Sequence, residues 1–156
     1  MTRIELETLV RAPQELCFDL ARSVDVHLHL AERSQERTVA GRTTGLLELG
    51  DDVTWEGRHL GLTRRLAVRI TQFDRPTSFR DEGEGGGIRR LVHEHFFLAR
   101  QGGTLMVDRF EVESVLRLLD RALLKPYFER FLRERSEGLR RLAESGEGES
   151  FLLSVG

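Results

Sequence analysis

Residues 116–144 read LRLLDRALLKPYFERFLRERSEGLRRLAE, and this stretch decides the fold. Apolar side chains recur every fourth residue, a spacing that predicts one long amphipathic helix. Pro126 lies inside the pattern and lacks a backbone N–H, so we expect a kink or a division into two helices there. The apolar stripe is formed by Leu119, Leu123, Tyr127, Phe131, Leu132, Leu139 and Leu142.

The sequence before this helix alternates between apolar and polar residues, which is the period of half-buried strands. Short turns separate these segments and favour antiparallel pairing. The stretch 41–50 has no clear pattern, and its state stays open. The expected strands are 3–10, about 34–40, 52–59, 64–73, 78–82, 89–99 and 104–113.

Two short helices, at 13–21 and 24–30, are expected directly after the first strand, with Pro13 and Ser23 at their starts. The predicted fold class is therefore α+β, with a curved antiparallel sheet of about six or seven strands wrapped around a long C-terminal helix. One domain is expected over residues 1–144. Residues 145–156 are expected to form a flexible tail, whose Phe151-Leu152-Leu153 leaves a homodimer contact open.

Length and composition exclude several classes of protein. A chain of 156 residues with 39% hydrophobic residues suits one globular domain. The net charge of -2 gives no general attraction to nucleic acid, and no segment has the ~20 apolar residues of a membrane span. Cys17 is the one cysteine, so no intrachain disulfide can form. We expect a cytoplasmic protein without stable membrane insertion, nucleic-acid partner or cofactor.

The order of these elements resembles the START/SRPBCC superfamily, whose fold is the helix grip. The resemblance covers residues 3–144 and is closest to bacterial members described as polyketide cyclase/dehydrase-like or cell-division-inhibitor-like. It implies a tunnel for a hydrophobic ligand and, as a rule, no metal and no cofactor. The segments that carry it are Ala12-Pro13-Gln14-Glu15 with Phe18, Gly50 to Trp55, Phe73-Asp74-Arg75-Pro76, His93-Glu94-His95-Phe96, Gly102-Gly103-Thr104 and the last helix.

The final hairpin allows an inference about side-chain direction. If Arg100 pairs with Gly103 around a two-residue turn, alternate residues of both strands face the helix. The same register places Glu94 opposite Arg109 on the outer face. The residues predicted to face inward are His93, His95, Phe97, Met106, Asp108 and Phe110.

Other strands and the helix complete the predicted ligand-binding wall. Trp55 and His59 share a strand face, and Gly57 between them leaves room for a ligand or for another side chain. The remaining predicted contacts are Phe79, Leu119, Leu123 and Tyr127.

A His95/Asp108 pair is the candidate for chemistry. The carboxylate would orient the imidazole and raise its pKa, which suits acid–base catalysis or the anchoring of a polar ligand group. A purely structural hydrogen bond is the third interpretation.

Metal binding is a separate possibility. His93 and His95 could supply two ligands, with Asp108 or His59 as a third. We nevertheless expect no metal, because no complete set of ligands follows from the sequence.

Three functions remain open at this point. The first is a binding protein for a small hydrophobic molecule, such as a lipid or an aromatic or polyketide-like compound. The second is a cyclase or dehydratase acting on such a compound through His95 and Asp108. The third is a regulatory interaction protein with a filled core, which a cavity of roughly 300 Å³ or more would argue against.

Overall fold

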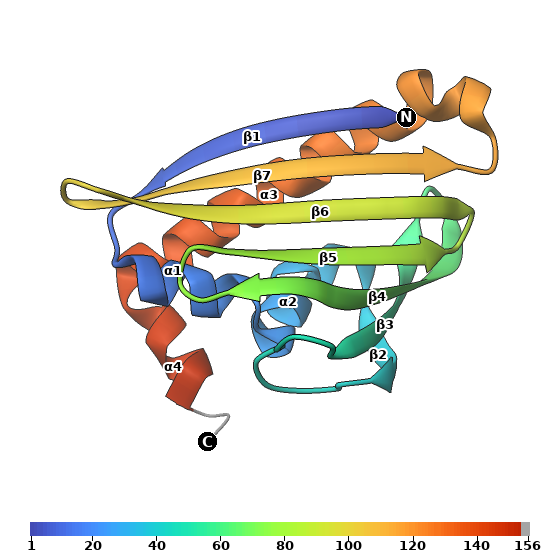
Figure 1. Cartoon of the computed structure of the whole chain (residues 1–156). Coiled ribbons are helices and arrows are strands. Elements are labelled where there is room, and N and C mark those ends of the chain that lie inside the picture. Colours follow the sequence, from blue (N-terminus) through green and yellow to red (C-terminus); the bar gives the residue numbers. More distant parts are fainter. Residues whose placement is uncertain (154–156) are drawn as a thin grey trace.

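A computed structural model describes residues 1–153 and contains one antiparallel sheet of seven strands (Figure 1). The order across the sheet is β1-β7-β6-β5-β4-β3-β2, so the first strand pairs with the last. The predicted α+β class and the curved sheet are confirmed. The strands are β1 (Thr2–Val10), β2 (Arg37–Gly41), β3 (Asp52–His59), β4 (Leu62–Asp74), β5 (Ser78–Gly85), β6 (Ile88–Arg100) and β7 (Gly103–Ser114).

The stretch 41–50, whose state the sequence left open, adds no strand beyond the last residue of β2. It makes one isolated antiparallel bridge between Leu46 and Ser23. β2 itself begins at Arg37, later than expected, because a short 3-10 turn, η1 (Glu32–Ser34), occupies the preceding residues.

Two short helices follow β1 as predicted: α1 (Gln14–Ala21) and α2 (Val24–Leu30). The Ser23 hydroxyl accepts a hydrogen bond from the backbone N–H of Val26 at 3.2 Å and so caps α2. Phe18 of α1 is fully buried and meets Phe73, Phe79 and Phe97 edge-on, with ring centroids 5.3–5.4 Å apart. This aromatic cluster fills the space between α1 and the sheet.

The long helix starts irregularly before its proline. A 3-10 turn, η2 (Arg117–Leu119), and a π-helical turn, η3 (Asp120–Leu124), precede the regular helix α3 (Lys125–Ser145). Pro126 lies in the first turn of α3, where a missing N–H costs no helical hydrogen bond. η3 runs into α3 without a loop between them, so the expected disturbance at Pro126 is a change of helix type and not a division into two helices. α3 crosses behind β1, β7 and β6 in the view of Figure 1.

Residues 147–153 of the expected tail form a further helix, α4 (Glu147–Leu153). Gly146 ends α3 in the left-handed conformation, with φ of 82°, and lets the chain turn. Phe151 and Leu152 then pack against the main core, and Gly148 lies against the side chain of Leu20. Phe151 and Leu152 therefore pack inside this chain. Residues 154–156 of the predicted tail lie outside the described residues.

No helix within residues 1–153 is both long enough and apolar enough to cross a lipid bilayer.

Candidate functional site: a cavity with buried histidines

A cavity of about 270 Å³ lies between the inner face of the sheet and α3. Its walls are mainly apolar, and its rim carries partly exposed leucines: Leu60, Leu116, Leu119 and Leu123. The volume is close to the lower end, roughly 300 Å³, of typical small-molecule sites. A small molecule, rather than a long lipid, matches this space.

Nine of the twelve predicted ligand contacts line the cavity. Leu119 and Leu123 lie at its rim instead of on a continuous helix floor, because they belong to η2 and η3. The nine are Trp55, His59, Phe79, His93, His95, Phe110, Leu119, Leu123 and Tyr127.

The other three predicted contacts, Phe97, Met106 and Asp108, face inward but do not line the cavity. Phe97 and Met106 belong to the core cluster around Phe18, which α1 places over that part of the sheet. Asp108 is hydrogen-bonded to His93 and buried, with 5% of its surface exposed.

The predicted hairpin register is confirmed at every pair. Arg100 pairs with Gly103, His95 with Asp108 and His93 with Phe110. Glu94 stands opposite Arg109 as expected, but the guanidinium of Arg109 forms its ion pair with Glu5 on β1, at 3.1 Å. Glu5 on the edge strand β1 therefore provides the negative charge for Arg109 that Glu94 was expected to provide.

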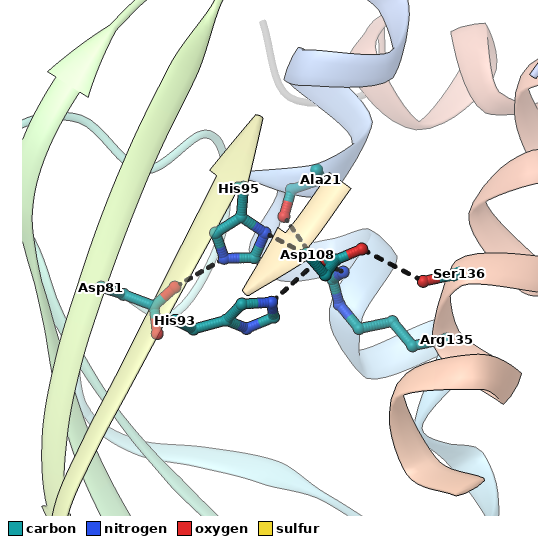
Figure 2. A network of polar contacts seen from close by, with 7 residues as sticks. All are labelled: Ala21, Asp81, His93, His95, Asp108, Arg135 and Ser136. Carbon is teal, nitrogen blue, oxygen red and sulfur yellow. Dashed lines mark hydrogen bonds and ion pairs between the residues drawn. The ribbon is translucent and has the colours of Figure 1, made fainter. Parts of the chain in front are cut away.

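Two buried histidines and two carboxylates form a network on the sheet side of the cavity (Figure 2). His93 Nε2 lies 2.8 Å from Asp108 Oδ1, and His95 Nε2 lies 2.8 Å from Asp81 Oδ2. His95 Nδ1 also faces Asp108 Oδ1 at 3.4 Å. The predicted pair is thus a larger cluster, in which Asp108 has its shorter contact with His93.

α3 closes the network from the other side. Arg135 Nη1 lies 3.8 Å from Asp108 Oδ1, and Ser136 Oγ lies 3.4 Å from Asp108 Oδ2. Arg135 also donates a hydrogen bond to the carbonyl oxygen of Ala21, at 3.2 Å (Figure 2). The helix and the sheet are therefore joined through one buried carboxylate.

The surroundings of the two histidines shift their pKa values in opposite directions. Burial would lower the pKa of His95, but hydrogen bonds to Asp108 and Asp81 outweigh it and raise that pKa. Burial and the neighbouring His95 lower the pKa of His93 to about 4. Burial would raise the pKa of Asp108, yet hydrogen bonds from both imidazoles hold it well below its ordinary value. With carboxylates at both of its nitrogens, His95 is the more readily protonated of the two rings.

These pKa shifts bear on the tautomer of His93. Asp108 is ionised and accepts a hydrogen bond, so Nε2 of His93 carries the proton. Nδ1 then holds a lone pair, and it has no hydrogen-bond partner among residues 1–153. The ring lines the cavity, and Nδ1 is the ring nitrogen left to accept a hydrogen bond. Both nitrogens of His95 face carboxylates, and the role of base predicted for His95 passes to His93.

Asp81 is the residue that the sequence interpretation missed. It lies on β5 directly opposite His93, and hydrogen bonds from His95 hold its pKa below the ordinary value although burial would raise it. A signal was present, because Asp81 is two residues after Phe79 and therefore shares its inward face. An aspartate was not expected on a wall predicted to be apolar.

Asp81, His93 and His95 have the spacing of a metal site. Their ligand atoms lie within 4.8 Å of one another, with Asp81 in the place that Asp108 or His59 was expected to take. The network also balances its own charge, because two carboxylates face the readily protonated His95 ring and the Arg135 guanidinium. The absence of a metal stays a prediction.

A second polar cluster lies in the cavity wall. His59 Nδ1 is hydrogen-bonded to the hydroxyl of Tyr127, and His59 Nε2 lies 3.5 Å from Glu36 Oε1. His27 Nε2 lies 3.3 Å from Glu36 Oε2, and the His27 ring stacks on Trp55 with centroids 3.8 Å apart. Glu36 lies just before β2, within the stretch of about 34–40 that was expected to be a strand, and it was not predicted to face the cavity.

Gly57 makes the room for Glu36. A Cβ at residue 57 would lie 2.5 Å from Glu36 Cγ and 3.1 Å from His59 Nε2. The space that the sequence left open beside Trp55 is therefore taken by another side chain.

Neither a known family model nor a curated protein sequence matches the chain. Solved structures do. The protein TTHA0849 from Thermus thermophilus superposes with a TM-score of 0.76 at 17% identity, over 93% of this chain and 99% of that one. Ara h 8.0201 gives 0.63 at 16% identity, over 96% and 98%. Major latex-like protein 151 from Panax ginseng gives 0.65 at 12% identity, over 91% and 97%. At these identities the likeness is one of architecture, and the chain shares the helix-grip fold with these proteins.

Proposed function

We propose that this chain binds a small, largely apolar molecule that donates a hydrogen bond to His93. The observation that carries the proposal is an apolar cavity of about 270 Å³ lined by the His93 ring, whose Nε2 is already hydrogen-bonded to Asp108. Apolar walls provide affinity, and a few polar atoms set orientation.

The fold supports placing the chain in the START/SRPBCC superfamily, and the motifs along residues 3–144 are similar to those of its bacterial cyclase-like members. A ligand cavity between sheet and helix agrees with that placement. The cavity of about 270 Å³ lies just under the roughly 300 Å³ of a typical ligand site, and its mainly apolar lining argues against the filled-core interaction protein.

Catalysis is a second candidate, because Asp108 and His93 form a carboxylate–imidazole dyad next to the cavity. Such a dyad can remove a proton from carbon next to a carbonyl, the first step of a cyclisation or dehydration, although the lowered pKa of His93, about 4, makes it a weak base. Exchange of the α-protons of 2-tetralone in D₂O, followed by NMR, tests this candidate. Faster exchange that His93→Gln abolishes would support it, and exchange at the buffer rate would rule it out for this ketone.

Binding is tested with the fluorescent probe 8-anilinonaphthalene-1-sulfonate. Trp55 is the one tryptophan of the chain and lines the cavity, so energy transfer from Trp55 to the bound probe reports occupancy. Leu91→Phe on β6 reduces the cavity and is expected to weaken binding at least fivefold. Leu98→Phe on the outer face of the same strand is the matched control, with unchanged binding expected. Equal binding to both variants would contradict an internal site.

A further inference from the structure

We propose that Glu36, His59 and Tyr127 form a second ligand-anchoring site in the same cavity, and that the ligand carries two hydrogen-bond donors on an apolar body. A dihydroxy aromatic compound has this chemistry. The proposal rests on the proposed function and adds the class of ligand to it.

Glu36 is a buried anion held by imidazoles. Its side chain is 6% exposed, and within residues 1–153 no arginine or lysine lies within ion-pair distance of it. Burial would raise its pKa, but contacts with His27 and His59 lower the pKa to about 2. A buried carboxylate needs donors. The Ser34 hydroxyl donates to Oε2 of Glu36 at 3.3 Å, while Oε1 faces His59 Nε2 at 3.5 Å and can accept a hydrogen bond from a proton-bearing Nε2 there.

We place the His59 proton on Nε2, toward Glu36. Nδ1 then holds the lone pair, and the Tyr127 hydroxyl donates to it. The phenol oxygen keeps its lone pairs for another partner. Burial, followed by the charge of Glu36, raises the pKa of Tyr127, which keeps the phenol protonated.

The same logic operates at both polar sites. A carboxylate faces the imidazole Nε2 in each and accepts its hydrogen bond, Asp108 from His93 and Glu36 from His59. The group left facing the cavity is an acceptor in both cases, the His93 Nδ1 lone pair and the Tyr127 oxygen. Two acceptors call for a ligand with two donors.

An apolar surface connects the two sites. The Phe110 ring lies 5.3 Å from His93 and 4.9 Å from Phe128, and Phe128 lies 5.4 Å from Tyr127, measured between centroids. These rings line the cavity between β6 and α3. A flat aromatic body can pack there while its two ends reach His93 and Tyr127.

The competing explanation is structural: the contacts among Glu36, His59 and Tyr127 would only hold α3 against β3. Ligand selectivity separates the two explanations, because a fastening would not distinguish one cavity ligand from another. Equilibrium dialysis against naphthalene, 2-naphthol, 2,7-dihydroxynaphthalene and 2,7-dimethoxynaphthalene measures the effect of each added group on one constant body. Tyr127→Phe removes the hydroxyl and keeps the ring, and thermal unfolding verifies that the variant is folded.

In the wild type the diol is expected to bind roughly three- to tenfold more tightly than 2-naphthol, the size of one net hydrogen bond. The dimethoxy compound, which has no donor, should lose that gain. In Tyr127→Phe the diol should fall to the affinity of 2-naphthol, and naphthalene should be unaffected. Tyr127 is the one tyrosine, so the tyrosine Fermi doublet in the Raman spectrum should also change when the diol binds.

Equal affinity of the diol for wild type and Tyr127→Phe, with naphthalene bound by both, would overturn this inference and leave the proposed function standing. Failure of all four compounds to bind the wild type would overturn both.

Discussion

The rings of His93 and His95 stack on one face of β6 with centroids 3.7 Å apart, yet their pKa values move in opposite directions. His95 lies between the carboxylates of Asp81 and Asp108, while His93 has only Asp108. The proton is therefore held more firmly by His95 than by His93, and Nδ1 of His93 is the nitrogen of this pair that no carboxylate occupies.

The first prediction concerns stability against pH. An unfolded histidine binds its proton near pH 6.5, whereas folded His93 does so at about 4. Between these values the unfolded chain binds the extra proton, so stability falls as pH falls, by up to about 2 kcal/mol between pH 6.5 and 4.5. His95 has the opposite sign: its contribution is complete below pH 6.5 and is lost as pH rises through its raised pKa.

Urea unfolding of His93→Gln measures this effect. The variant should show a flatter profile between pH 6.5 and 4.5 than the wild type. Equal slopes in the two proteins would show that His93 is not the neutral member of the pair.

The second prediction concerns Asp108, which is the shared partner of two imidazoles and one guanidinium. Asp108→Asn leaves buried positive charge without its anion and should cost roughly 3–5 kcal/mol in the free energy of unfolding. Asp52→Asn is the matched control, because its ion pair with Arg69 is 3.5 Å long and both side chains are more than half exposed. That change should cost roughly 0–1 kcal/mol. Similar losses of unfolding free energy in both variants would mean that the buried network stabilises the fold no more than an exposed ion pair does.

The third prediction concerns Gly57. Its replacement by alanine brings a Cβ into the space of Glu36 Cγ and should cost roughly 1–3 kcal/mol of stability. The double variant with Glu36→Ala removes the colliding side chain. A double-mutant cycle should therefore give a strong favourable coupling between the two changes. Additive losses would show that Gly57 does not hold the space for Glu36.

The fourth prediction concerns α4. Phe151 and Leu152 pack on the core, whereas Leu153 of the same helix is 83% exposed. Phe151→Ala should lower the unfolding free energy by roughly 1–3 kcal/mol, less than for a fully buried ring, and Leu153→Ala should change it by at most about 0.5 kcal/mol. If Phe151→Ala were silent in thermal unfolding, the predicted flexible tail would have been the better description.

Much of the sheet follows from the sequence because its rules are local. A two-residue turn at Gln101-Gly102 fixes the hairpin, and alternation then assigns the inward residues of two strands. The bounds of β3 and α2 also agree with the pattern, since Gly61 and Ser23 mark a turn and a cap.

The site itself depends on contacts that no local rule supplies. Glu36 contacts His59 across 23 positions of sequence. That contact is possible because Gly57 has no side chain in the space that Glu36 occupies. Asp81 reaches His95 through a strand pairing whose register shifts between Gly83 and Gly85. Phe97 and Met106 were predicted on the cavity wall because alternation gives the face but does not show that α1 covers that part of it.

The strand order has a consequence for biosynthesis. β1 leaves the ribosome first, but its partner β7 ends at Ser114 and is the last strand to be made. β1 therefore has no strand partner until more than two thirds of the chain has emerged. Pairing across so long a separation raises contact order and slows folding. The alternating charges Arg3, Glu5 and Glu7 on that waiting strand would discourage its association with other nascent chains.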